Sequence, residues 1–62
     1  MRERLVDSIE AEVTRMYKAG DFVGLELEDV IYIVEGYFWK FGLETDEDEI
    51  ESIIACASGI HA

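Results

Sequence analysis

The chain has 62 residues, half of them hydrophobic, and a formal net charge of −10. This length allows one small domain, which buries only about 60% of its unfolded surface and usually needs an additional source of stability. The single cysteine, Cys56, excludes an internal disulfide, and one histidine, His61, provides no zinc-ligand cluster. We therefore expect stabilisation by association with another chain. The excess of acidic over basic residues disfavours direct binding to nucleic acid or to an anionic membrane.

The first residues, MRERLVDSIEAEV, carry charges where a secretory signal would need an apolar segment. The sequence contains no run of about 18 apolar residues. Together with the lone thiol, these features favour a cytoplasmic protein.

A first helix is predicted over residues 3–19, because apolar residues recur along one stripe about 120° wide. The stripe consists of Leu5, Val6, Ile9, Val13, Met16 and Tyr17. Arg15 and Lys18 suit the last turn, and Gly20 suits the end of the helix. Three apolar residues of the following loop are expected to cover the core: Phe22, Val23 and Leu25.

The stretch VIYIVEGYFWKF, residues 30–41, allows two interpretations. Its branched and aromatic residues favour strands, and Glu35-Gly36 could turn a hairpin. That pair is not a preferred hairpin turn, however, and both strands would be apolar on both faces. On a helix, the apolar residues instead fall within one arc of about 160°. They are Leu27, Val30, Ile31, Ile33, Val34, Tyr37, Phe38 and Phe41. We therefore predict a helix over 27–41.

The ends of this second helix also fit. Acidic residues suit its first turn, and Lys40 suits its last turn. Gly42 can take the left-handed conformation that ends a helix, with Leu43 folding back onto Phe38. Because its apolar arc is the widest, this helix is expected to be the hub of the core.

A third helix is predicted over residues 46–58. Thr45 and Asp48 have the spacing of a capping box, in which each side chain bonds the backbone amide of the other residue. A narrow apolar face follows, made of Ile50, Ile53, Ile54 and Ala57. Gly59 is expected to end the helix, with Ile60 as its hydrophobic follower.

The segment ETDEDEIE places six carboxylates in eight residues. It lacks the glycine and the spacing of a calcium-binding loop, so no metal site is predicted. Acidic residues in a first helical turn usually serve the helix dipole and solubility. The alternative is an array that imitates a phosphate backbone and blocks a nucleic-acid-binding protein. Its candidate residues are Asp46, Glu47, Asp48 and Glu49.

On the polar side of the second helix, Tyr32 and Trp39 lie seven residues apart, beside Gly36 and flanked by Glu28 and Glu35. One interpretation is that the other two helices also cover this side. The other is an exposed aromatic stripe with a glycine that permits close approach, a composition typical of interface hot spots. These five residues are the candidate partner-binding residues.

The predicted fold is an all-α, three-helix domain with a hydrophobic central helix, expected to be dimeric. No catalytic residue, cofactor or metal site is predicted, because no base is oriented by a third group and the small helical chain offers little concavity. The predicted function is that of a non-enzymatic regulator or inhibitor that binds another protein, as many phage and mobile-element proteins do. The expected partners are a second copy and an unidentified, basic protein. A structural homo-oligomer and the nucleic-acid mimic are the alternatives.

Overall fold

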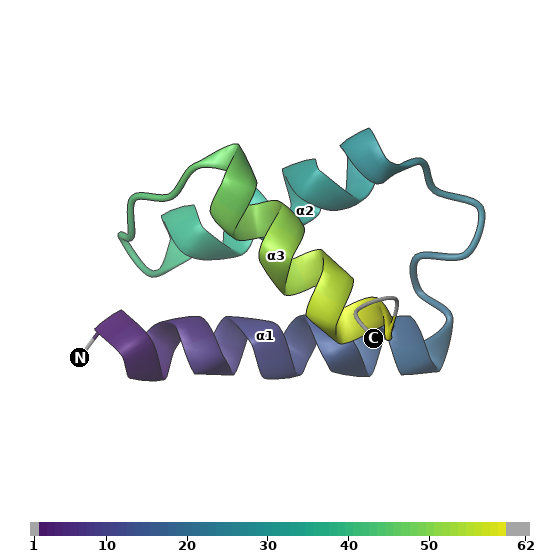
Figure 1. Ribbon diagram of the computed structural model, residues 1–62, viewed down its shortest axis with the longest axis horizontal. Helices are drawn as coiled ribbons and strands as arrows, with labels where there is room; N and C mark the ends of the chain where they lie inside the picture. The colour runs from purple at the N-terminus through teal and green to yellow at the C-terminus, as the bar shows by residue number, and fades with distance from the viewer. Residues whose placement is uncertain (1, 60–62) are drawn as a thin grey trace.

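The computed structural model describes residues 2–59, which form three α-helices joined by two loops (Figure 1). α1 spans Arg2–Ala19, α2 spans Leu27–Lys40 and α3 spans Glu47–Ser58. The three predicted helices are confirmed, and none of their bounds differs by more than one residue. No strand occurs within residues 2–59, and residues 30–40 lie inside α2, so the hairpin interpretation is wrong.

Glycines end α1 and α2 in the same way. Gly42 has a φ of 72°, and its amide donates a hydrogen bond to the Trp39 carbonyl at 2.9 Å. The Leu43 amide donates a hydrogen bond to the Phe38 carbonyl at 2.8 Å. This is the Schellman arrangement, and it confirms the predicted return of Leu43 onto Phe38. Gly20 ends α1 with a φ of 82°, and the Asp21 amide donates to the Met16 carbonyl at 2.9 Å.

The start of α3 differs from the predicted capping box. The cap is Asp46, whose carboxylate accepts the Glu49 amide at 2.8 Å. The Thr45 hydroxyl donates instead to the Glu49 carboxylate at 2.6 Å. The Thr45–Asp48 capping box was therefore wrong, because Asp46 is the better acceptor and moves the start of the helix one residue along. Gly59 ends α3 with a φ of 79° as predicted, whereas Ile60 and His61 lie outside the described residues.

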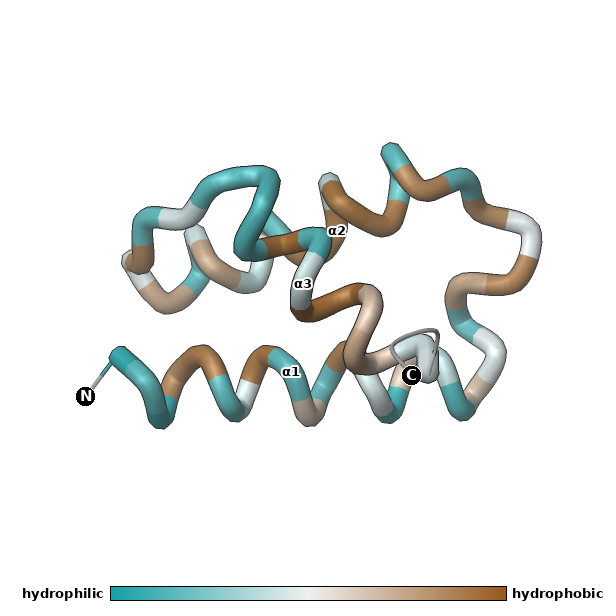
Figure 2. Tube along the Cα trace, viewed as in Figure 1, coloured by the Kyte–Doolittle hydropathy of each residue, from teal (hydrophilic) through white to brown (hydrophobic). Residues whose placement is uncertain are grey.

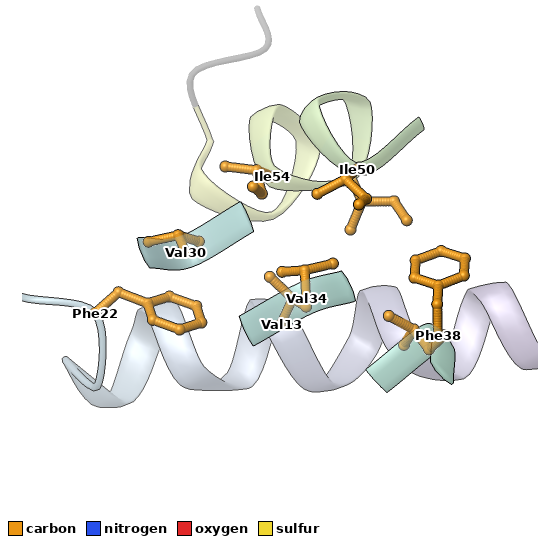
Figure 3. Close-up of a cluster of buried hydrophobic side chains, with 9 residues drawn as sticks. Val13, Phe22, Val30, Val34, Phe38, Ile50 and Ile54 are labelled. Carbon is orange, nitrogen blue, oxygen red and sulfur yellow. The ribbon is translucent and has the colours of Figure 1, made fainter. Parts of the chain in front are cut away.

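The core draws on all three helices and one loop residue. Its buried members are Ile9, Val13, Phe22, Val30, Val34, Phe38, Ile50, Ile53 and Ile54. Figure 2 shows hydrophobic residues recurring along every helix and a continuous hydrophilic stretch where the chain enters α3. In Figure 3 the Phe38 ring of α2 points toward Ile50 of α3, and Val13 of α1 and Val34 of α2 belong to the same buried cluster.

The hub of this core is α3, not α2. α3 crosses the other two helices obliquely (Figure 1), and its contacts with each of them are more extensive than those between α1 and α2. The reason lies in how far the apolar residues of each helix extend along its axis beyond the core. The narrow face of α3 is almost wholly buried, whereas the broad arc of α2 extends past the core at both ends. Leu27 and Phe41, the first and last residues of the predicted apolar face along the chain, are 56% and 42% exposed.

The loop between α1 and α2 is only partly as predicted. Phe22 is buried and packs edge-on against the Tyr17 ring, with centroids 4.7 Å apart. Val23 and Leu25 are 83% and 41% exposed and do not cover the core. The turn that follows Gly20 aims one of these three side chains inward and leaves the others in solvent.

Candidate protein-binding surface

One surface of α2 is apolar although it faces solvent. Val30, Val34 and Phe38 are buried, each one helical turn from the next, and they fix which side of α2 meets the core. Tyr32 and Trp39 project from the other side, and their exposed fractions are 72% and 66%. Of the two sequence interpretations, the structure therefore shows the exposed one. We call Glu28, Tyr32, Glu35, Gly36 and Trp39 the aromatic stripe.

Gly36 is exposed and lies between the two aromatic side chains along the helix. Apart from its chain neighbours and the backbone of its own helix, a Cβ atom added there would meet no atom within 4 Å. Glycine inside a helix costs about 1 kcal/mol relative to alanine. Packing within this fold therefore does not require a glycine at this position. Because Gly36 has no side chain, the helix surface between the two rings is left without a protruding group.

The charges around the aromatic stripe are mostly negative. Glu28 is exposed and Glu35 is half-buried, and both lie on the same side of the two rings. Asp29 and Lys40 lie on the opposite side and are both exposed. A surface of this kind, with an apolar centre and a charged rim, resembles the anatomy of protein–protein interfaces.

A second group of exposed apolar side chains lies where the first loop enters α2. Val23, Leu25 and Leu27 form this group. Sequence reasoning missed it, because it assigned all three to the core. The available signal was that Gly20 and Gly24 bracket a tight turn, in which the adjacent side chains of Phe22 and Val23 cannot both face inward.

The acidic run is partly engaged within the fold. Glu49 accepts two hydrogen bonds from the Arg2 guanidinium, at 2.7 and 3.0 Å, in addition to that from Thr45. These hydrogen bonds, chiefly those from Arg2, hold the pKa of the Glu49 carboxyl below its usual range. The Asp46 carboxylate is engaged as the cap of α3. Of the four residues predicted for the phosphate-mimicking array, only Glu47 and Asp48 are therefore exposed and make no side-chain hydrogen bond within residues 2–59.

Other kinds of site have less support in the described part of the chain. Within residues 2–59 no three His, Cys, Asp or Glu side chains come together as metal ligands. None of the described helices has the length and apolar character needed to cross a membrane. Cys56 is exposed on α3, with no partner thiol in the sequence. The chain matches no protein-family model, no curated protein and no solved structure, so the surface has to be interpreted from its own chemistry.

Proposed function

We propose that this protein is a non-enzymatic regulator that binds another protein through the aromatic stripe of α2. The observation that supports the proposal most is the 72% and 66% exposure of Tyr32 and Trp39 on one face of one helix. Tryptophan and tyrosine are the residues most enriched among binding hot spots. A helix that presents two such rings to solvent gains no stability from them until a partner covers them.

The chemistry of the surroundings points to a basic partner surface. Glu28 and Glu35 flank the rings, and the net charge of the whole chain is −10. Complementary charge speeds encounter and suppresses wrong partners more than it adds affinity. The rings are therefore expected to set the lifetime of the complex, and the carboxylates its rate of formation.

Capture from the native host tests this function when matched variants are compared. Wild-type protein should retain a partner that Trp39→Ala loses, because the ring is the centre of the surface. Val23→Ala is the control, since Val23 is 83% exposed but lies outside the aromatic stripe. Retention of the same partner by Trp39→Ala and by Tyr32→Ala would contradict the proposal.

A structural homo-oligomer is the second candidate, and the remaining exposed apolar side chains support it. Leu25, Leu27 and Phe41 are each more than 40% exposed in a chain with no disulfide. A dimer would cover such residues and stabilise each copy by mass action. The nucleic-acid mimic ranks third, because Asp46 and Glu49 already bond within the fold.

A further inference from the structure

The outward face of α1 carries a row of residues whose spacing matches the aromatic stripe. The row consists of Arg4, Ser8, Ala11 and Arg15, all exposed, and we call it the α1 stripe. Its members follow the pattern i, i+4, i+7, i+11, which places them in one line along a helix. Opposite it, Ile9 and Val13 face the core and are 1% and 0% exposed.

Four members of the aromatic stripe follow the same pattern: Glu28, Tyr32, Glu35 and Trp39. Each row is therefore about 16 Å long at 1.5 Å per residue. The chemistry of the two rows is complementary. One has cations at its ends and small residues between them, whereas the other has large rings and carboxylates.

The match holds for both directions of helix packing. With the helices parallel, Arg4 faces Glu28 and Arg15 faces Trp39, and with the helices antiparallel the two arginines exchange places. In both cases a small residue faces the Tyr32 ring and the other small residue lies near Glu35 and Gly36. A cation then meets a carboxylate at one end and the face of an indole at the other, where cation–π attraction operates.

Building on the proposed function, we propose that the aromatic stripe of one copy binds the α1 stripe of a second copy. Charge complementarity selects this occupant. The last two-thirds of the chain carry eleven acids and one base, so arginines of this protein that are free to meet Glu28 or Trp39 lie on α1. Arg15 donates two hydrogen bonds to Glu12, at 3.1 and 2.5 Å, and the arginine side chain is 60% exposed, so water and a partner can compete for it.

Pairing of two α2 helices about a two-fold axis is the competing arrangement. It would bring Glu28 and Glu35 of both copies to one interface, with Lys40 as the only base on each helix. Burying carboxylates without partners is costly. The α1–α2 pairing lowers this cost, because it gives Glu28 an arginine partner and brings together only one copy's Glu28 and Glu35. It is heterologous, because different surfaces of the two copies meet.

Two variants that each disable one stripe provide the test. Ala11→Glu adds bulk and negative charge to the α1 stripe but keeps Trp39, the only tryptophan. Trp39→Ala removes the ring but keeps the α1 stripe. All the changed side chains are exposed, so both variants should fold, which circular dichroism checks. Ser52→Glu is the matched control, since it adds the same charge to an exposed position of α3.

Each variant alone should associate at least tenfold more weakly than wild type, and Ser52→Glu should associate like wild type. Titration of Ala11→Glu with Trp39→Ala should shift the Trp39 emission to shorter wavelength and saturate at one to one. If Ala11→Glu self-associates like wild type, the α1 stripe is not the surface that the aromatic stripe binds. The aromatic stripe would then pair with another surface of the second copy. If Trp39 stays solvent-exposed in wild type and in the mixture, the aromatic stripe does not bind a second copy. The capture experiment from the native host then tests the proposed function independently.

Discussion

Phe38 and Trp39 are adjacent in the chain, but their exposed fractions are 0% and 66%. The difference follows from the 100° step of a helix, which carries successive side chains to different faces. Phe38 belongs to the core cluster with residues of α1 and α3, whereas most of the Trp39 side chain faces solvent. Substitutions at these two positions should therefore separate folding from binding.

Phe38→Ala should lower the free energy of unfolding by about 3–5 kcal/mol, because it leaves a cavity in a close-packed core. Trp39→Ala should change it by no more than about 0.5 kcal/mol, as is usual at exposed positions. Urea denaturation of both variants at high dilution measures the two values. Equal losses would mean that the buried face of α2 is assigned incorrectly.

Gly36→Ala should stabilise the isolated chain by up to about 1 kcal/mol, because alanine is the better helix former and its Cβ meets no atom within 4 Å. The same methyl group should weaken binding at the aromatic stripe, since it raises the surface between the two rings. Thermal unfolding and a binding assay on the same variant measure the two effects. A less stable Gly36→Ala chain would show that the fold itself requires the glycine.

Among the helices, α1 and α3 are joined at their N-terminal ends by a polar contact. The Arg2 guanidinium bonds the Glu49 carboxylate and also donates to the carbonyl of Glu44 at 3.0 Å. The contact ties the first turn of α1 to the entry of α3. Because Arg2 is exposed, its contribution should be modest and sensitive to salt.

The pH dependence of unfolding should report this contact. The Glu49 pKa is lower in the folded state than in the unfolded chain, so its stabilisation is fully present above the unfolded value. It is lost as the pH falls through the lower, folded pKa. Glu49→Gln should therefore flatten the acid limb of the curve of unfolding free energy against pH, as should Arg2→Ala. An unchanged acid limb in both variants would contradict the contact.

The helices were predictable from the sequence, but part of their arrangement was not. The segregation of Val30, Val34 and Phe38 from Glu28 and Glu35 predicts α2 and its faces. Which helix contacts the other two most extensively depends on crossing angles and side-chain volumes that no periodicity encodes, so the role of α3 was missed. The start of α3 was placed one residue early, because Thr45 and Asp46 are both good caps and the local bonds of both residues to Glu49 decide between them.

The candidate site was partly predictable for a similar reason. The pattern of α2 places Tyr32 and Trp39 together on its polar side. Their exposure depends on where α1 and α3 pack, which the structure supplies. The exposed Leu27 and Phe41 show the converse, because an apolar residue on the correct face stays largely in solvent when it lies at the end of its helix and outside the core.

For the whole molecule, charge should oppose association over long distances. Two chains of −10 repel each other, and the screening length falls from about 30 Å at 0.01 M salt to about 8 Å at 0.15 M. Self-association should therefore tighten between these two salt concentrations, since the few exposed ion pairs at the interface contribute little. Light scattering across a salt series measures the change. Weaker association at 0.15 M salt would mean that attraction between opposite charges dominates the contact.

The central claim is that the aromatic stripe binds a second copy of the chain, and sedimentation equilibrium at micromolar concentration tests it most directly. Wild-type protein and the Val23→Ala control should both show an average mass above that of a 7.1 kDa monomer, rising with concentration. Trp39→Ala should remain monomeric under the same conditions. A wild-type chain that stays monomeric throughout, or a Trp39→Ala chain that associates as strongly as wild type, would contradict the account.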